Sequence, residues 1–451
     1  MRKRLVILGG GESGVGTALL AKQKGYDVFV SDYGNILDKY KDELKNAEIQ
    51  FEEGKHSDTI ILDADIIVKS PGIPDKAPVI KKAIENHIPI IGEIEFAFQH
   101  NHSKIIAITG SNGKTTTTLL TYHLLKSNGS NVAIGGNVGK SYARILAEND
   151  QYDWIVLELS SFQLDSIQTF SADISMILNI TKDHLDRYDY KIENYIRSKF
   201  LITKNIHQGQ TLIYNTQNES TVNYLKQHPN LLKFAIGVDS NEFMDGKFQL
   251  PNQKFVFDLS TSSLRGIHNY YNAYCASLAA FMTGLVTEEQ IQKALNSFVN
   301  APHRLEKVAI IDNVEYINDS KATNVDSVYY ALQSMTKPTI LILGGVDKGN
   351  DYNEIIDFVK EKVKIIVAMG TDNSPILNYF PSKNIKTIST NSLDEAINES
   401  LKNAQSGDAV LLSPACASFD LFKNYEDRGD QFRSKILAKI KADVEAKLGE
   451  N

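Results

Sequence analysis

The sequence predicts an α/β protein of three domains built on mainly parallel sheets. Apolar runs of strand length alternate with helical patterns along almost the whole chain. These runs are continuously apolar, which is typical of parallel strands that helices cover on both faces. The chain has 451 residues. Because a domain commonly holds about 100–200 residues, one sheet is not expected to hold every strand.

Two breaks indicate where the domains end. A new strand–loop–helix unit begins at residue 105, and another begins near residue 308. We therefore predict domains of 1–98, 99–300 and 301–451. Examples of the strands expected in them are residues 5–8, 28–30, 66–68, 105–108, 155–157, 174–178, 340–343, 365–369 and 409–412.

One segment of the middle domain breaks the α/β alternation, at residues 241–264. Residues 243–250 and 254–259 favour two short antiparallel strands around the Asp-Gly turn at 245–246.

Composition excludes several classes of protein. The net charge is −7, so the chain is not a general nucleic-acid binder. The two cysteines, Cys275 and Cys416, are far apart and form no disulfide framework, which favours a reducing compartment. No apolar run reaches the roughly 18 residues of a membrane span, and "MRKRLVILGGG" lacks the apolar core of a signal peptide. We expect a cytoplasmic protein that acts as a monomer.

The first glycine loop, "GGGESGVG" at 9–16, follows a predicted strand and precedes a predicted helix at 17–24. Gly9, Gly11 and Gly14 match G-x-G-x-x-G, and Asp32 ends the next strand, where dinucleotide domains often bind a ribose. Backbone amides and a helix N-terminus would face a phosphate. NAD is one candidate ligand, and a tight turn without a ligand is the alternative.

The second glycine loop, "TGSNGKTT" at 109–116, also joins a predicted strand to a predicted helix. The Walker pattern requires glycine at 108, where the chain has Ile108, and the first glycine is Gly110. Lys114 would neutralise β/γ-phosphate charge, and the Thr115 hydroxyl would bind Mg²⁺. The loop therefore predicts a site for the phosphates of Mg-ATP.

Carboxylates and a histidine follow two further strands. Glu158 ends one apolar strand, at the edge where α/β proteins bind ligands, although an exposed strand-end residue is the alternative. His184 and Asp186 follow another strand, but no third ligand at zinc spacing accompanies them. Thr181 and Asp183 could instead cap a helix start.

Long motifs connect these pieces. They are "LELSSFQL" at 157–164, "NITKDHLDRY" at 179–188, "APHRLE" at 301–306, "NDSKATN" at 318–324 and "LSPACASFDLFKNYEDRG" at 412–429. With the shorter loop G-x-x-G-K-[ST] at 110–115, the sequence resembles the Mur ligases over essentially its whole length. The resemblance implies a Rossmann-like N-terminal domain for a UDP-sugar, a central mononucleotide-binding ATPase domain and a Rossmann-like C-terminal domain.

The motifs also indicate a branch of that family. The third domain has "INDSKATN" where other members have D-N-P-R or D-Y-x-H. The resemblance therefore implies ligation of D-glutamate to UDP-N-acetylmuramoyl-L-alanine in peptidoglycan precursor synthesis. ATP would phosphorylate the alanyl carboxylate, and the amine would attack the acyl phosphate through a tetrahedral intermediate, releasing ADP and phosphate.

The family's site residues carry over by position. For ATP they are Gly110, Ser111, Asn112, Gly113, Lys114, Thr115, Thr116, Asn269, Asn272, Arg304 and Asp319. For the UDP-sugar they are Glu12, Ser13, Asp32, Gly72 and Asn137, so the first glycine loop would hold a diphosphate instead of NAD. For D-glutamate they are Lys321, Thr323, Lys348, Ser418 and Phe419. Two Mg²⁺ ions would be held by Thr115, Glu158, His184 and a carbamate on Lys199, and the catalytic residues would be Lys114, His184 and Lys199.

Two departures and three rival functions accompany this interpretation. Tyr33 and Gly34 follow Asp32, where better-known relatives have Thr-Arg, and Tyr425 stands where Phe is common. The rivals are a folylpolyglutamate synthase, which would not need the first domain, an NAD-dependent dehydrogenase, which leaves "TGSNGKTT" unexplained, and a regulator that only senses ATP.

Overall fold

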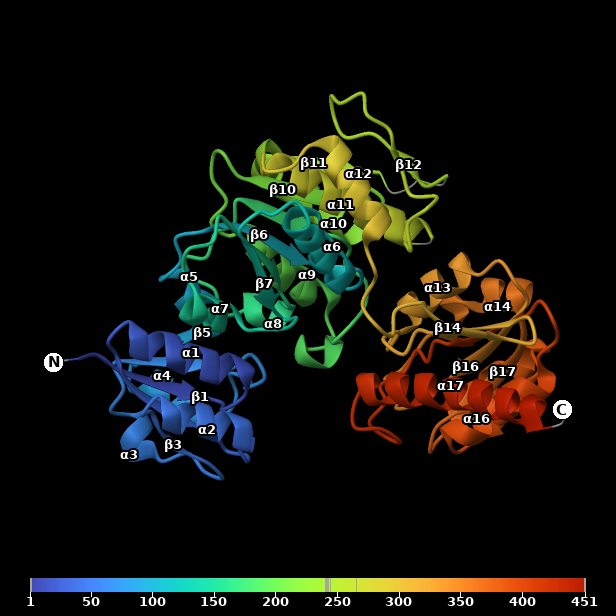
Figure 1. The fold of residues 1–451 in the computed structure, drawn as a ribbon. Coiled ribbons are helices and arrows are strands. Elements are labelled where there is room, and N and C mark those ends of the chain that lie inside the picture. Colours follow the sequence, from blue (N-terminus) through green and yellow to red (C-terminus); the bar gives the residue numbers. More distant parts are fainter. Residues whose placement is uncertain (1, 240–242, 244, 265, 450–451) are drawn as a thin grey trace. The chain divides into compact units, whose positions relative to one another are not determined.

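The structure is a computed structural model that describes residues 2–239, 243, 245–264 and 266–449 (Figure 1). The chain divides into two compact units. One contains Met1–Ser262 and Asn269–Phe298, and the other contains Ser263–His268 and Val299–Asn451. The first unit holds two large parallel sheets and the second holds one large, mainly parallel sheet, as the α/β prediction requires.

The first sheet has the strand order β3-β2-β1-β4-β5, with all pairs parallel, which is a Rossmann-like arrangement. The order reverses between β1 and β4, and α/β proteins of this kind commonly bind a ligand at the carboxyl ends of such strands. The strands are β1 (Arg4–Leu8), β2 (Asp27–Ser31), β3 (Gln50–Glu52), β4 (Ile66–Lys69) and β5 (Ile90–Gly92). The helices are α1 (Glu12–Gln23), α2 (Asp38–Asn46), α3 (Asp58–Ile61), α4 (Pro78–Glu85) and α5 (Glu93–Phe98).

Helix α1 begins earlier than its glycines suggested. The helix was predicted from residue 17, and it begins at Glu12. A Cβ on Gly14 would lie 1.8 Å from the Gly9 carbonyl oxygen, and one on Gly16 would lie 2.2 Å from Ser141 Oγ. These glycines therefore permit close packing of the first helical turns, and the prediction that they belong to a loop was wrong.

The central sheet has the strand order β11-β10-β9-β6-β8-β7, again with all pairs parallel. Its strands are β6 (Lys104–Thr109), β7 (Val132–Gly136), β8 (Trp154–Glu158), β9 (Ile174–Ile177), β10 (Thr211–Asn215) and β11 (Ala235–Val238). Its helices are α6 (Lys114–Lys126), α7 (Tyr142–Glu148), α8 (Ser161–Leu164), α9 (Ile192–Phe200), α10 (Glu219–Gln227), α11 (Ile267–Met282) and α12 (Glu288–Ser297). Because β6 lies between β8 and β9, three strand ends meet around the second glycine loop.

The predicted antiparallel strands are present as a short pair, β12 (Lys247–Phe248) and β13 (Phe257–Asp258). The turn at Asp245 and Gly246 precedes β12 instead of joining the two strands, so its predicted place was wrong. Residues 241, 242 and 244 of the predicted segment lie outside the described residues.

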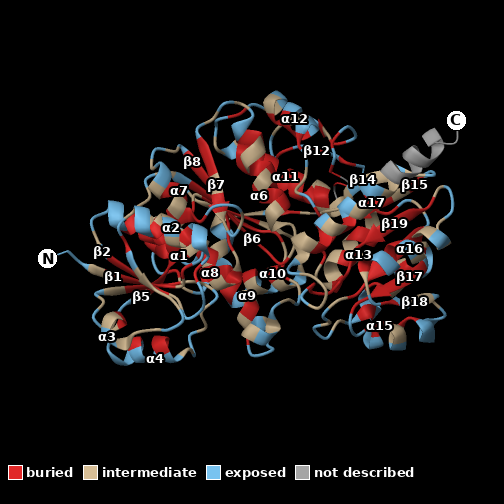
Figure 2. Ribbon diagram, turned by 60° about the horizontal axis from the view of Figure 1, so that its bottom comes forward, coloured by how far each residue is buried: buried red, intermediate tan, exposed pale blue. Residues whose placement is uncertain are grey.

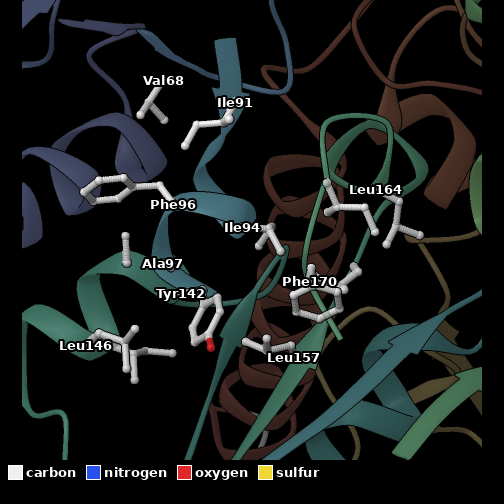
Figure 3. Packing of buried hydrophobic residues seen from close by; sticks show 14 of the residues in the cluster. Val68, Ile91, Ile94, Phe96, Ala97, Tyr142, Leu146, Leu157, Leu164 and Phe170 are labelled. Atoms are coloured by element: carbon white, nitrogen blue, oxygen red, sulfur yellow. The ribbon is translucent and has the colours of Figure 1, made fainter. Parts of the chain in front are cut away.

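One hydrophobic cluster joins the first sheet to the central sheet (Figure 3). Ile94 and Phe96 from α5 pack in the same cluster as Tyr142 and Leu146 from α7 and Leu157 from β8. The two domains therefore share a core within one unit.

Glu93, the first residue of α5, is a buried acid at this junction. Its Oε1 accepts a hydrogen bond from the Ala143 backbone N–H at 2.7 Å. Its Oε2 and the Tyr142 hydroxyl have no hydrogen-bond partner in the described part of the chain. Burial raises the pKa of Glu93 to about 7.

The C-terminal unit has the strand order β14-β15-β19-β16-β17-β18, in which only β14 is antiparallel to its neighbour. The strands are β14 (Glu306–Ile311), β15 (Val314–Asn318), β16 (Thr339–Leu343), β17 (Val363–Met369), β18 (Thr387–Thr390) and β19 (Ala409–Leu412). The helices are α13 (Val325–Ser334), α14 (Ile356–Lys362), α15 (Ser374–Tyr379), α16 (Leu393–Asn403) and α17 (Tyr425–Gly449).

Successive residues of β16 point to opposite faces of this sheet. Leu341 packs in a cluster with Leu332 of α13, and Ile342 packs in another with Ile397 of α16 and Phe432 of α17. Figure 2 shows the buried strands between helices whose outer sides are exposed. In the described residues, no helix is long and apolar enough to cross a membrane.

Candidate active site

The second glycine loop lies between β6 and α6 and is built around left-handed glycines. Gly110 has φ +154° and Gly113 has φ +83°, a region that glycine tolerates. Lys114 begins α6 and donates hydrogen bonds to the carbonyl oxygens of Gly110 at 2.8 Å and Ser111 at 2.9 Å. The loop thus leads directly into the N-terminus of α6, where free backbone amides favour phosphate binding.

Asn179, just beyond β9, fixes the shape of this loop. Its Oδ1 accepts from the Asn112 N–H at 2.9 Å, and its Nδ2 donates to the Asn112 carbonyl at 3.0 Å. The Asn179 carbonyl also accepts from the Ser111 N–H at 2.9 Å. Thr181 extends the contact, because its N–H donates to Ser111 Oγ at 2.9 Å. Asn179 opens the motif "NITKDHLDRY", but no role was predicted for it.

Glu158 ends β8 beside the loop and is almost fully buried. Asn137 Nδ2 donates to its Oε1 at 2.9 Å, while its Oε2 has no hydrogen-bond partner in the described residues. Gly136 (φ +94°) allows this approach, because a Cβ there would lie 2.3 Å from the Glu158 carbonyl oxygen. The predicted UDP-sugar residue Asn137 and the predicted metal residue Glu158 are therefore direct neighbours. A buried carboxylate oxygen without a donor is suited to a cation.

Lys199, near the end of α9, is buried beneath the same loop. Its Nζ donates to the Gly110 carbonyl oxygen at 2.7 Å and lies 4.5 Å from the centre of the Tyr195 ring. Burial lowers the pKa of Lys199 well below its usual value, and the charge of Lys114 lowers it further. The amine of Lys199 therefore loses its proton more readily than that of an ordinary lysine.

His184 lies in a strained segment after β9, with φ 51°. Its ring is about half exposed and makes an edge contact with Phe162, with ring centres 5.2 Å apart. Its backbone N–H donates to Asp183 Oδ1 at 2.9 Å. Across the described residues, no three side chains of the His, Cys, Asp and Glu types gather as a metal cluster. A cation here would draw on few protein ligands, as Mg²⁺ does when it also binds substrate phosphates.

Two buried asparagines of α11 lie against the second glycine loop. Asn272 Oδ1 would be 2.6 Å from a Cβ on Gly113, and its Nδ2 donates to Asn269 Oδ1 at 3.4 Å. The structure therefore brings both predicted ATP residues of this helix to the phosphate loop.

The first glycine loop is organised by Asp32 at the end of β2. Asp32 accepts hydrogen bonds from the backbone N–H groups of Gly10 at 2.5 Å and Gly34 at 2.7 Å. Glu12 is engaged elsewhere, because it accepts from Arg144 Nε at 2.7 Å and from the Ser141 N–H at 3.1 Å. Its carboxylate thus bridges the first and central domains.

Seven of the predicted residues lie in the C-terminal unit, whose strands β15, β16 and β19 end side by side. Asp319 is buried there and accepts from the Leu305 N–H at 3.2 Å and from Ser413 Oγ at 2.8 Å. Burial raises its pKa to about 7. Lys321 places its ammonium 3.5 Å from the centre of the Tyr425 ring.

The other predicted residues of this unit differ in exposure. Ser418 is buried, whereas Lys348 and Phe419 are exposed, and Arg304 and Thr323 are half-buried.

Arg428 was not singled out from the sequence, yet it braces the strand ends of the C-terminal unit. The side chain is fully buried. Its Nε donates to Ser320 Oγ at 2.9 Å, and its Nη1 and Nη2 donate to the Cys416 carbonyl at 3.2 Å. It thereby connects the "NDSKATN" and "LSPACAS" segments, which contain the predicted ligand residues Lys321 and Ser418.

Family models match three parts of the chain. Residues 3–92 match the Mur ligase MurD-like N-terminal domain, residues 108–280 match the Mur ligase middle domain, and residues 303–416 match the Mur ligase glutamate ligase domain. The matched regions follow one another in the order of the three sheets.

Individual proteins are similar over almost the full length. Proteins named UDP-N-acetylmuramoylalanine–D-glutamate ligase from Christiangramia forsetii and Cytophaga hutchinsonii are 49% and 50% identical, and each alignment covers 97% of this chain and 99% of the relative. Among solved structures, a pseudomurein peptide ligase type C from Methanothermus fervidus has the same fold, with a TM-score of 0.62 and 21% identity over 97% of this chain and 100% of that one.

Proposed function

The chain belongs to the Mur ligase family, and on that basis we propose that it joins D-glutamate to UDP-N-acetylmuramoyl-L-alanine at the expense of ATP. The proposal rests on the residues that meet at one edge of the central sheet. There the phosphate loop with Lys114, the buried amine of Lys199 and the buried carboxylate of Glu158 come together. A dehydrogenase would not need this second loop.

ATP is proposed to bind at the second glycine loop, through residues 110–116. The amides around Asn112 and Gly113 and the Lys114 ammonium would offset phosphate charge. Asn269 and Asn272, which lie against this loop, are proposed as further ATP contacts. Arg304 and Asp319 are also proposed as ATP contacts, from the family's motifs alone.

Magnesium fits the central-domain residues. Thr115 follows Lys114 at the start of α6, and Glu158 offers a buried oxygen without a protein donor. We propose that Thr115, Glu158, His184 and Lys199 hold two Mg²⁺ ions together with the phosphates. When bound, Mg²⁺ would offset the repulsion between the negative charges of the alanyl carboxylate and the γ-phosphate.

We propose that Lys199 carries a carbamate. The carbamate would replace the positive ammonium group with a negative group whose oxygen can bind Mg²⁺. Carbamylation requires a neutral amine to attack CO₂, and the buried position of Lys199 favours that form. The modification would also release the Gly110 carbonyl from the Lys199 ammonium.

The UDP-sugar is proposed to bind across the first glycine loop. Because the Glu12 carboxylate is already paired with Arg144, Glu12 and Ser13 would contribute their backbone amides at the start of α1. Asp32, Gly72 and Asn137 are proposed as the other contacts.

D-glutamate is proposed to bind at the strand ends of the C-terminal unit. Lys321 and Lys348 would pair with its two carboxylates, and Thr323, Ser418 and Phe419 would complete the pocket. Arg428 would hold the two loops that carry Lys321 and Ser418.

The chain's own residues would act mainly by positioning and charge. Lys114 would draw electrons from the γ-phosphate as the alanyl carboxylate attacks it. The C-terminal pocket would then present the neutral amine of D-glutamate to the acyl phosphate. We favour a metal-ligand role for His184, because a nitrogen that binds a metal cannot also accept the amine proton.

One assay tests the function. Phosphate release from ATP is measured with UDP-N-acetylmuramoyl-L-alanine and D-Glu, L-Glu, meso-diaminopimelate or L-Lys in turn. Release that depends on D-Glu alone supports the proposal. Release with L-Glu, meso-diaminopimelate or L-Lys contradicts the proposal and favours a rival ligase. No release with any amino acid also contradicts it and favours an ATP-sensing regulator.

We also propose that the enzyme acts as a cytoplasmic monomer. Both cysteines are free and buried, as expected in a reducing compartment. Sedimentation of a dimer at working concentrations would contradict the monomer.

A further inference from the structure

Arg187 connects a loop of the first domain to the central domain. It ends a short 3₁₀ turn, Leu185–Arg187, just after His184. Its Nη2 donates to the Pro71 carbonyl at 2.7 Å, and its Nη1 lies 3.4 Å from the Gly72 carbonyl. Both acceptors belong to the loop after β4, at the edge of the first sheet where the order reverses.

That loop lies against the first glycine loop. A Cβ on Gly9 would be 2.3 Å from Ser70 Oγ, so the two loops touch directly. The Ile73 N–H donates to the Ser70 carbonyl at 3.0 Å, and Lys69 Nζ donates to the Ile73 carbonyl at 3.1 Å. A shift of this loop would therefore shift the proposed diphosphate site.

The other side of the Arg187 guanidinium faces the central domain. It lies 4.4 Å from the centre of the Phe162 ring, a cation–π contact. Phe162 also contacts the ring of His184 at 5.2 Å and that of Tyr188 at 6.1 Å. Tyr188 in turn donates to Asp165 Oδ2 at 2.9 Å. Arg187 is thus packed between the first-domain loop and the segment that carries His184.

We propose that Arg187 is a positioning residue that sets the distance between the nucleotide end and the reacting end of the sugar-nucleotide substrate. This inference rests on the proposed function. A substrate anchored at both ends reacts well only if the two anchors are correctly spaced, and a misplacement of about 1 Å costs on the order of a hundredfold. The Arg187 guanidinium contacts the Pro71 and Gly72 carbonyls near the proposed nucleotide anchor. It also contacts the Phe162 ring beside His184, near the proposed reacting end.

Two variants and one control test the proposal. Arg187→Gln removes the planar cation, and Arg187→Lys keeps the charge but not the flat contact with Phe162. Arg197→Gln is the matched control, because Arg197 is an exposed arginine of α9 that bonds Asn194 of its own helix. Thermal unfolding of all three verifies that they fold.

The kinetic readout compares whole and truncated substrates. For Arg187→Gln, kcat/KM for UDP-N-acetylmuramoyl-L-alanine should fall about ten- to a hundredfold, with KM for ATP and D-Glu nearly unchanged. With N-acetylmuramoyl-L-alanine, which lacks the nucleotide, variant and wild type should be nearly equal. Arg187→Lys should lie between, and Arg197→Gln should match the wild type. An equal loss with both substrates would overturn the proposal.

Hydrogen exchange without ligands separates this inference from the proposed function. Peptides covering residues 70–74 should exchange faster in Arg187→Gln than in the wild type or Arg197→Gln. Unchanged exchange would overturn the proposal. A wild type that is inactive with UDP-N-acetylmuramoyl-L-alanine would contradict the function and, with it, the role in substrate spacing, whatever the exchange result.

Discussion

Lys114 and Lys199 donate hydrogen bonds to the same backbone oxygen, that of Gly110, at 2.8 and 2.7 Å. Two ammonium groups at one carbonyl repel each other, and this repulsion adds to the burial that lowers the pKa of Lys199. The phosphate loop thereby holds its charged lysine beside a lysine that readily becomes neutral.

Activity should depend on CO₂ through Lys199. Removal of CO₂ should lower phosphate release, and bicarbonate should restore it, because the neutral amine of Lys199 carries the proposed carbamate. Lys199→Ala should lose activity by about a hundredfold or more and recover in part with a short carboxylate such as formate. Intact-protein mass measurement should show one CO₂ on the wild type only.

The control for this prediction is Lys204→Met, which removes an exposed lysine that donates to the Ile167 carbonyl. It should keep both the activity and the bicarbonate response. Wild-type activity that ignores CO₂ would contradict the carbamate.

Asn179→Asp should weaken ATP binding. The substitution removes the donor to the Asn112 carbonyl and adds a negative charge beside the proposed polyphosphate site. We expect KM for ATP to rise about tenfold or more, equivalent to about 1.4 kcal/mol, with KM for D-Glu little changed. Steady-state kinetics with each substrate varied in turn provides the measurement.

Asn205→Asp is its control, because Asn205 also donates to two backbone carbonyls, those of Gln168 and Phe170, away from the loop. An equal effect of the two substitutions on KM for ATP would show that the loop contact is not responsible.

Gly136→Ala should destabilise the protein more than Gly139→Ala. Both glycines have positive φ, so alanine is strained at both, and more at Gly136, whose φ of +94° lies beyond the left-handed region that contains the +66° of Gly139. Only Gly136 lacks room, since its Cβ would lie 2.3 Å from the Glu158 carbonyl oxygen, whereas nothing lies within 4 Å of a Cβ on Gly139. We expect a difference of about 1–3 kcal/mol in the free energy of unfolding, measured by denaturant titration. Equal losses would contradict the steric explanation.

Glu93→Gln should stabilise the protein in a pH-dependent way. The pKa of Glu93 rises from 4.5 to about 7 on folding, so the acid costs stability as pH rises through that window. The gain from glutamine should be small near pH 4, grow between pH 4.5 and 7, and stay constant above, with an upper limit of about 3 kcal/mol.

Glutamine can still accept the bond from the Ala143 N–H, so that contact is preserved. Thermal unfolding of both proteins across the pH range checks this prediction. A gain that is independent of pH would show that Glu93 does not ionise in this window.

Local sequence patterns predicted the strands and helices that their own residues determine. Continuous apolar runs such as 340–343 became central strands, because burial on both faces demands apolar residues at every position. Several strands were not among those named from the sequence. They include β3 and β5, which have three residues each at the two edges of the first sheet and so carry too little pattern. The start of α1 was missed because its glycines serve packing against Ser141, which lies far away in sequence.

The same distinction holds for the candidate site. Lys114 follows its glycine loop directly, so the motif alone located it. The partners of Glu12 and Glu158, by contrast, depend on how strands and domains meet. Arg144 lies 132 residues from Glu12. Asn137 follows β7, whereas Glu158 ends β8. No spacing rule predicts such pairs.

The shared hydrophobic cluster between the first and central sheets has a thermal consequence. Because α5 and α7 pack in one core (Figure 3), melting either domain exposes apolar surface of the other, and the two should lose structure together. The C-terminal unit has its own clusters on both faces of its sheet. A calorimetric scan should therefore resolve two transitions for three domains, and cleavage near residue 98 should leave neither fragment stably folded.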